Sequence, residues 1–343
     1  MDNKAITLNS GKVNAYLHHI DMRSYGTTRM LSSFLGEFED YSILFDCGSS
    51  LDVKKGLRYF KKNQIPLSSF KYLITSHHHF DHNGGLWKLY EIIKKHNPTV
   101  KILTNATTKL LLNDYEQHLA RGRSTYGNLV GEMKPIKDKA FEIIEPSKNF
   151  TSNPNNLDII DTFNINNSEI KLAVLKTPGH TPDHQTPVLI KNNTIDFIFL
   201  GEAAGTIYHD SKLLTMPTSM PIYYNHEDYM NSLENLKKLK PLKAGYGHFG
   251  VVNGQDNVQQ IIIEHEEFMR KFRNLITEYY NEKPETKYIL EKILPELIAR
   301  TDLSLDSNPL FKNIVLGIVY GMMISLGFRE IPQEEMKYLK LKF

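Results

Sequence analysis

The chain has 343 residues, with 41 Lys and Arg against 39 Asp and Glu, and its formal net charge of +2 gives no reason to expect a polyanionic partner. Its 41% hydrophobic content is ordinary for a globular protein and ample for a sizeable core. The single cysteine, Cys47, excludes a disulfide within the chain, and the first residues lack the apolar segment of a signal peptide. We therefore expect a cytoplasmic protein.

The first part of the chain predicts buried strands in alternation with helices. Residues 41–47 (YSILFDC), 70–75 (FKYLIT) and 100–104 are short apolar runs, which are typical of buried strands. Residues 53–63 and 86–96 have the apolar spacing of amphipathic helices. The basic outer face of 53–63 predicts a solvated surface rather than a phosphate site.

The same alternation returns further along. Residues 170–176 and 194–200 predict strands, and 228–239 predicts a helix. Residues 113–150 are less regular, and we expect a loop or lid there. The chain after Asn257 has a helical pattern throughout. This change predicts two domains, 1–255 and 256–343, of which the second is all helical.

The run 314–328 (IVLGIVYGMMISLGF) is apolar but only fifteen residues long. A helix needs about 20 residues to cross the hydrocarbon core of a membrane. The run therefore predicts a buried helix, and no membrane association is expected.

The segment 75–85, TSHHHFDHNGG, places four histidines and an aspartate in six consecutive positions directly after a predicted strand. Unpaired imidazole and carboxylate groups are costly to bury, so a core has little use for them. Both are common ligands of zinc and similar ions. His77 and His79 are two positions apart and point the same way on an extended strand end. Asp81 and His82 follow after a turn and can face a second ion.

Four ligands cannot complete two coordination spheres, so more must come from elsewhere in the chain. Three candidates follow other predicted strands: His180, Glu202 and His248. In α/β proteins, chemistry is often placed where strands end. Ligand type and spacing leave the metal open between zinc, iron and manganese, with zinc preferred.

Four stretches together resemble a known family. S-H-H-H-F-D-H-N-G-G, T-P-G-H-T-P-D-H, F-L-G-E-A-A and Y-G-H-F-G are similar, in this order, to the metal motifs of the metallo-β-lactamase superfamily. The resemblance covers about residues 5–255. It implies a four-layer αβ/βα sandwich with the site between two mixed sheets, followed here by a helical C-terminal extension.

The resemblance also implies two adjacent divalent metal ions. The matching positions form two ligand sets, His77, His79 and His180 for one ion and Asp81, His82 and His248 for the other. Glu202 stands where the family usually has a bridging aspartate. Because its side chain is one methylene longer, three options stay open: it bridges both ions, binds one, or shifts the second site.

The remaining candidates are interpreted as structural. Strand alternation turns His78 away from the ligands, and His184 is expected to orient a ligand rather than bind metal. We expect His18 and His19 to be surface or partly buried residues rather than part of a cleft mouth. Cys47 ends an apolar strand and is not expected to be a nucleophile.

These observations predict a metal-dependent hydrolase. Two close cations would lower the pKa of a shared water and give a metal-bound hydroxide near neutral pH, which attacks a carbonyl carbon. Asp81 would act as the catalytic residue that orients the hydroxide and carries its proton to the leaving atom. The chain contains no G-x-S-x-G motif of a serine hydrolase.

The expected substrate is a small acyl compound, a thioester or similar ester, because T-P-G-H-T-P-D-H resembles the stretch shared by glyoxalase II-type thioesterases and acyl-homoserine-lactone lactonases. A lactonase is the first alternative. Its usual tyrosine, three residues after the bridging position, is replaced here by Gly205, although Tyr208 is nearby.

Other functions of the same fold are less well supported. An RNA or phosphodiester hydrolase would need a basic tail, but residues 256–343 hold twelve Lys and Arg against fourteen Asp and Glu. A diiron redox protein would have glutamate at the position of His79. A binding module without activity would not need all seven ligand positions filled.

The C-terminal run also contains two glycines on one helix face, Gly317 and Gly321. Glycine lowers helix stability by roughly 1 kcal/mol against alanine, so the pair indicates close approach of another backbone. The expected explanation is packing within the helical domain. The alternative is a homodimer through the C-terminal helices.

Overall fold

The computed structural model describes residues 5–303 and 309–331, and two seven-stranded sheets dominate it. The first sheet has the order β2-β3-β4-β5-β6-β7-β8. Its strands are β2 Gly11–Lys12, β3 Leu17–Asp21, β4 Ser32–Glu37, β5 Ser42–Phe45, β6 Phe70–Ile74, β7 Lys101–Thr104 and β8 Phe141–Ile143.

The second sheet has the order β1-β14-β13-β12-β11-β10-β9. Its strands are β1 Ile6–Thr7, β9 Ile159–Ile165, β10 Ser168–Lys176, β11 Gln185–Lys191, β12 Thr194–Gly201, β13 Lys243–Tyr246 and β14 Val251–Asn253. Both sheets are mixed, since β5 through β8 pair in parallel, as do β12 and β13, while the other neighbours are antiparallel.

The two sheets pack face to face through an aromatic core. The ring of Phe34 on β4 lies 5.1 Å from that of Phe197 on β12, and Phe45 on β5 lies 5.9 Å from Phe199. All four side chains are fully buried. The alternation of side chains along each strand allows one face to supply this core while the other meets helices.

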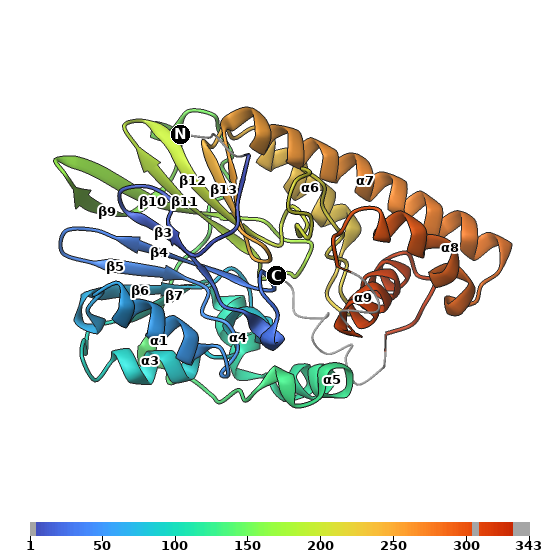
Figure 1. Cartoon of the computed structure of the whole chain (residues 1–343), viewed down its shortest axis with the longest axis horizontal. Helices are drawn as coiled ribbons and strands as arrows, with labels where there is room; N and C mark the ends of the chain where they lie inside the picture. The colour runs from blue at the N-terminus through green and yellow to red at the C-terminus, as the bar shows by residue number, and fades with distance from the viewer. Residues whose placement is uncertain (1–4, 304–308, 332–343) are drawn as a thin grey trace.

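Helices cover the outer face of each sheet (Figure 1). Helices α1 (Val53–Lys62) and α3 (Leu86–Ile93) pack on the first sheet, where the ring of Phe60 lies 4.9 Å from that of Phe70. Helices α6 (His226–Leu236) and α7 (Gln255–Glu282) pack on the second. The layers are therefore helix, sheet, sheet and helix, as the resemblance implied.

Two further helices follow in the described part of the C-terminal region, α8 (Thr286–Ile298) and α9 (Pro309–Ser325). One continuous apolar core runs from the second sheet through α6 and α7 into both of them. The all-helical pattern after residue 255 is thus observed over the described residues, and α7 begins at Gln255. The division into two domains stays a prediction.

Residues 113–150, where we expected a loop or lid, contain several regular elements. They contain helix α5 (Glu116–Tyr126), short 3₁₀ helices at Gly127–Val130 and Asp138–Ala140, and strand β8. Helix α5 buries only Leu119 and Gly122, which agrees with the lack of a clear apolar stripe in its sequence. Two other helices flank the region upstream, α2 (Phe80–Asn83) and α4 (Ala106–Asn113).

None of the helices in the described ranges is both long and apolar enough to cross a membrane. Helix α9, which includes most of the apolar run 314–328, instead packs into the core through side chains such as Ile318, Val319 and Met322. This agrees with its interpretation as a buried helix.

Candidate metal centre

The seven predicted ligands come together where strands of both sheets end. The histidine-rich segment follows β6, and α2 begins immediately after His79. His180 follows β10, Glu202 follows β12 and His248 follows β13. The turn after α2 is tight, because a side chain at Gly85 would lie 2.6 Å from the carbonyl oxygen of Ser49.

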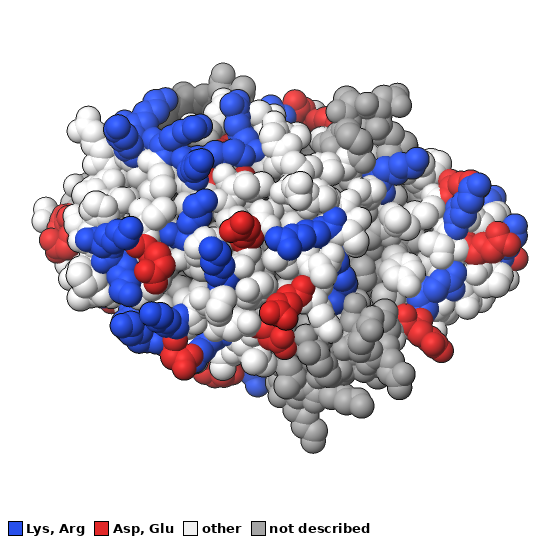
Figure 2. Space-filling view, turned by 90° about the horizontal axis from the view of Figure 1, so that it is seen from below, with Lys and Arg blue, Asp and Glu red and all other residues white. Residues whose placement is uncertain are grey.

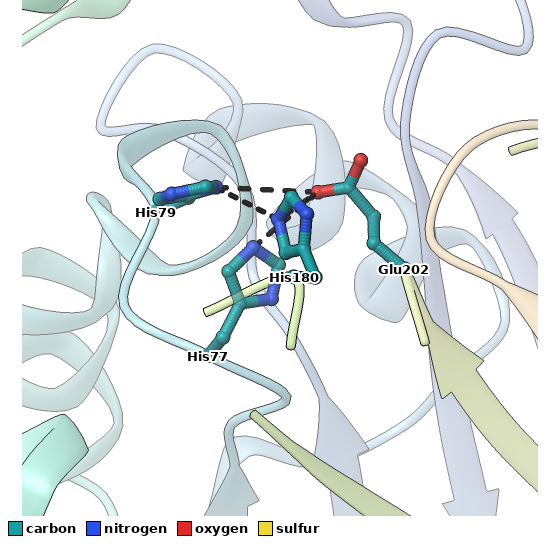
Figure 3. Close-up of side chains that lie close together, drawn as sticks. All are labelled: His77, His79, His180 and Glu202. Carbon is teal, nitrogen blue, oxygen red and sulfur yellow. Dashed lines mark hydrogen bonds and ion pairs between the residues drawn. The ribbon is translucent and has the colours of Figure 1, made fainter. Parts of the chain in front are cut away.

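The first group consists of His77, His79, His180 and Glu202, shown in Figure 3. Oε2 of Glu202 lies 2.8 Å from Nε2 of His180, 3.4 Å from Nε2 of His77 and 4.0 Å from Nδ1 of His79. The facing nitrogens of His79 and His180 are 3.1 Å apart.

The second group consists of Asp81, His82 and His248. Nε2 of His248 lies 3.3 Å from Nε2 of His82 and 3.7 Å from Oδ2 of Asp81. The Glu202 carboxylate also reaches this group, with Oε2 3.4 Å from Nε2 of His82 and Oε1 3.8 Å from Nε2 of His248. Glu202 therefore lies between the two groups.

Hydrogen bonds on the far side of the rings fix the tautomers. Nδ1 of His180 faces the carbonyl oxygen of Thr218 at 2.7 Å, and Nδ1 of His248 faces the carbonyl oxygen of Met30. A carbonyl oxygen only accepts, so each Nδ1 carries the proton. Each Nε2 is then left with a lone pair directed at the centre, the form in which histidine binds metal.

Asp46, at the end of β5, sets the tautomers of two more histidines. Its Oδ2 accepts from Nδ1 of His82 at 2.9 Å and from the Ser76 hydroxyl at 2.6 Å. Because the one Ser76 hydroxyl proton goes to Asp46, Ser76 Oγ accepts from Nδ1 of His77 at 2.9 Å. Oδ1 accepts from the Ser76 amide and the Asn83 side chain, both at 2.7 Å. Such outer partners orient metal ligands.

The main chain of Glu202 is held by side chains. Its N–H donates to Nε2 of His184 at 3.2 Å, and its carbonyl oxygen accepts from the hydroxyl of Thr218 at 3.0 Å. The hydroxyl of Tyr229 lies 3.1 Å from the same carbonyl oxygen. The preceding Gly201 has φ 54° and lies so close to His184 that a Cβ would be 2.8 Å from Nε2. The carboxylate is thereby fixed in its direction.

The charges in the centre suit a cation. Burial lowers the pKa of His77 and of His79 well below its usual value, and neighbouring imidazoles lower it further. Burial alone would raise the pKa of Glu202, but His180, His77 and His82 hold it well below its usual range. Neutral imidazoles around an ionised carboxylate are the protonation states that ligate metals.

The surroundings of His82 also call for a positive charge in the centre. Burial favours its neutral form, but Asp81, Asp46 and Glu202 together raise its pKa well above the usual value. Its Nε2 faces Nε2 of His248 at 3.3 Å, and two facing lone pairs repel unless a proton or a metal ion lies between them. His77 Nε2 is buried and makes no hydrogen bond of good geometry. The donor set therefore fits divalent metal binding.

The other histidines lie outside these two groups. His78 is buried and its Nδ1 lies 2.9 Å from Oδ1 of Asp183, while His184 supports the main chain of Glu202. His18 and His19 are fully buried rather than superficial, and contact Glu37 and Ser32. Burial raises the pKa of Cys47 well above its usual value, which keeps the thiol protonated.

A cavity of about 530 Å³ opens on the centre and is lined by His79, Asp81, Glu202 and His248 among others. Tyr208 also lines it, with its ring 6.0 Å from that of His248. Gly205 leaves no space for a tyrosine, because it has φ 79° and a Cβ would lie 2.5 Å from the ring of His265.

Two contributors were not predicted from the sequence. Asp46 had a usable signal, since it is a carboxylate directly after a buried apolar strand. His118 on α5 had none: it stacks on His79 with ring centroids 5.2 Å apart and lines the cavity, but it lies in a helix without a clear pattern.

Known proteins share this sequence pattern and fold. A protein from Sulfurisphaera tokodaii, the metallo-beta-lactamase fold-containing protein ST1585, is 25% identical over 203 residues, which cover 58% of this chain and 69% of the relative. Its crystal structure superposes with a TM-score of 0.57 at 18% identity, over 90% of this chain and 98% of that one.

Two solved metallo-beta-lactamases also share the fold. An enzyme from Cronobacter sakazakii has a TM-score of 0.52 at 13% identity, over 78% of this chain and 95% of that one. A B3 enzyme described as having an active-site glutamic acid has a TM-score of 0.51 at 12% identity, over 78% and 91%.

The family model of the metallo-beta-lactamase superfamily matches residues 26–248, which include all seven predicted ligands. The fold and the resemblance stated from the motifs are thus confirmed. Together with the two ligand groups, the match supports a metal-dependent hydrolase. The chain belongs to the metallo-beta-lactamase superfamily.

Proposed function

We propose that this protein hydrolyses a small acyl substrate, a thioester or related ester, with two divalent cations held by the two ligand groups. The observation that carries the proposal is the position of the Glu202 carboxylate, within 4.0 Å of five histidine nitrogens from both groups. We propose zinc as the metal, with iron or manganese as alternatives, because imidazole and carboxylate suit all three.

In such a site, bound cations lower the pKa of water and polarise a carbonyl group. The side chains of the two ligand groups would hold the cations and thereby orient the water and the carbonyl group. Asp81 is the one carboxylate of the second group, and it is part exposed and lines the cavity. We assign Asp81 the role of orienting the attacking water and carrying its proton to the leaving atom.

The cavity supports an uncharged acyl compound over a nucleic acid. Its volume lies in the range of about 300–1,000 Å³ that is usual for small-molecule sites. On the face in Figure 2, acidic side chains are interspersed among the basic ones, although Lys and Arg gather toward one end. A continuous basic track, as a nucleic-acid backbone requires, is not seen on the described part of this face.

A lactone is the second candidate. Tyr208 lines the cavity beside His248, and we propose that its hydroxyl would face a substrate oxygen. Burial and the nearby Glu202 carboxylate raise the pKa of Tyr208 well above its usual value, so the phenol stays protonated and can donate a hydrogen bond.

Metal analysis with a substrate panel tests the proposal. We expect about two metal ions per chain in freshly purified protein, and hydrolysis of a thioester or ester but not of phosphodiesters or RNA. His77→Ala and His180→Ala should each lose metal and activity, whereas His96→Ala, at an exposed histidine in the turn after α3, should lose neither. Full metal content and unchanged hydrolysis in either ligand variant would contradict the assignment.

A further inference from the structure

The cavity beside the candidate metal centre has apolar walls away from its polar end. Helix α9 supplies Ile314, Leu316 and Tyr320, and the segment before α6 supplies Met220. Arg121 on α5 also lines the cavity, but it already interacts with other residues of the chain. The rest of the space offers little that would hold a charged group.

The α9 wall is fixed in place. Nδ2 of Asn313 donates to the carbonyl oxygen of Thr125 on α5 at 2.9 Å, which links the two helices on either side of the cavity. The hydroxyl of Ser219 donates to the carbonyl oxygen of Ile318 at 2.7 Å. The apolar space is therefore built into the fold, which lowers the cost of ordering it when a ligand binds.

We propose that this cavity binds an apolar acyl arm, an alkyl or aryl chain, and places the reacting carbonyl at the end formed by Asp81, Glu202 and His248. This specificity rests on the proposed function, because it assumes that the bond cleaved is an acyl bond at the metal centre. Each methylene buried in such a site should raise kcat/KM about fourfold, the equivalent of about 0.8 kcal/mol.

A series of p-nitrophenyl esters from acetate to octanoate tests the chain-length preference of the metal-loaded enzyme. Gly317 lines the cavity, and a Cβ there would point at Met220 Sδ, 2.8 Å away. Gly317→Leu should therefore fill part of the space and lower kcat/KM for octanoate at least tenfold, while acetate changes less than threefold. Ile314→Ala should enlarge the space and extend the preference to longer chains. Lys312→Leu, on the exposed face of α9, is the matched control.

Calorimetric binding of octanoate, with acetate as the reference, measures the same preference without hydrolysis. Tight octanoate binding without turnover of any ester would support the cavity assignment and contradict the proposed function. Equal activity on all chain lengths with no octanoate binding would overturn the cavity assignment. The assignment would also be overturned if a folded Gly317→Leu protein lost kcat/KM equally for all esters and Ile314→Ala gained none for long chains.

A second, independent observation concerns the imidazole of His118. The main-chain N–H of Phe80 donates to its Nε2 at 3.1 Å. Because an N–H group can only donate, Nε2 must carry a lone pair, and the neutral ring has its proton on Nδ1. Turning the ring over would leave the Phe80 amide facing a carbon atom, so this orientation is the one that satisfies both groups.

His118 lines the cavity and stacks on the metal-centre residue His79. No described residue accepts a hydrogen bond from its Nδ1. We infer that His118 is a positioning residue whose Nδ1–H donates a hydrogen bond to an oxygen of the bound acyl substrate. This assignment also rests on the proposed function.

Two substitutions separate this role from a structural one. His118→Phe keeps the ring but removes the donor, and His118→Asn places an amide N–H near the position of Nδ1. Both variants remove the acceptor of the Phe80 amide, so the loss of that hydrogen bond affects them equally. We expect His118→Phe to lower kcat at least tenfold with KM within threefold, and His118→Asn to recover most of the loss, with about two metal ions retained in both.

Unchanged kcat in His118→Phe, or equal loss in both variants, would overturn the assignment. Loss of a metal ion would also overturn it, because His78, His79 and His118 lie close enough together to form a ligand group of their own.

Discussion

Oε2 of Glu202 lies 2.8 Å from Nε2 of His180 and 3.4 Å from Nε2 of both His77 and His82. One carboxylate oxygen thus touches histidines of both ligand groups. Of the three options left open by the sequence, this position favours a bridging role for Glu202. The fixed main chain of Glu202 directs its carboxylate at both groups.

The first prediction concerns the charge of Glu202. Glu202→Gln keeps the shape but removes the negative charge that offsets two cations, so we expect it to lose one metal ion and most of the hydrolysis rate. Glu202→Ala should do the same, while Glu202→Asp should keep two ions. Metal content by mass spectrometry after dialysis checks this, with the exposed Glu267→Gln as the control. Two ions retained in Glu202→Ala would show that the residue does not bind metal.

The second prediction concerns Asp46, which is not a predicted ligand but accepts a hydrogen bond from the predicted ligand His82. Asp46→Asn would replace one carboxylate oxygen by an NH2 group, which donates and cannot accept. At the Oδ2 position it would lose the bonds from the His82 ring and the Ser76 hydroxyl, and at the Oδ1 position those from the Ser76 amide and the Asn83 side chain. We expect metal affinity to fall about 10- to 100-fold, as for other partners that orient ligands.

Competition with a fluorescent zinc chelator measures this affinity. Asp40→Asn, an exposed carboxylate at the end of the preceding turn, serves as the control. Affinity equal to that of the wild type would mean that Asp46 supports only the fold.

The third prediction concerns stability at acid pH. His265 is fully buried between Tyr229 and Thr215, and burial together with the charge of Arg300 lowers its pKa to about 3. Between pH 6.5 and 3 the unfolded chain therefore binds a proton at this position that the folded chain does not. The stability this ring contributes is present above pH 6.5 and is lost as pH falls.

Urea unfolding between pH 7 and 4 checks the effect. Replacing the ring in His265→Gln should remove up to about 3 kcal/mol of this acid-dependent loss, because each pH unit corresponds to about 1.4 kcal/mol. His96→Gln, at an exposed position, should leave the dependence of the free energy of unfolding on pH unchanged. The prediction would be contradicted if the free energy of unfolding changed equally with pH in the wild type and in His265→Gln.

The sequence located most of the centre because ligand order carries strong information. The candidates in segment 77–82 and the three at strand ends could be proposed without a structure, since their position after apolar runs is a local property, and the structure brings them together. Strand and helix limits differ from expectation by a few residues, as with helix α9, which begins at Pro309. Such limits depend on tertiary packing.

What the sequence could not supply are the contacts between distant segments. His118 lies 38 residues from Phe80, whose amide fixes its tautomer. Helix α5 approaches the ring of Phe80 closely at Gly122, where a Cβ would lie 2.9 Å from that ring, and the spacing of apolar residues in its own sequence does not reveal this contact. For this reason, the expectation of a loop or lid at 113–150 missed the regular elements of this segment.

The last prediction concerns the two glycines of α9. The close approach expected from their spacing is present, but its partner lies within the chain: a Cβ at Gly321 would be 2.0 Å from the carbonyl oxygen of Ser219. Ser219 is itself bonded to α9 through Ile318 and cannot withdraw. At Gly317 the obstacle is only the flexible end of Met220.

Gly321→Ala should therefore destabilise the protein by about 1–3 kcal/mol, the usual cost of overpacking. Gly317→Ala should be close to neutral, because the gain in helix propensity of about 1 kcal/mol offsets the shift of Met220. Urea unfolding gives both values, and sedimentation of the same proteins tests the homodimer alternative, which stays a prediction. Intramolecular packing requires that both variants keep the oligomeric state of the wild type. A wild-type dimer that becomes a folded monomer in Gly317→Ala, with unchanged stability of the subunit, would instead place this helix face at an interface between two copies.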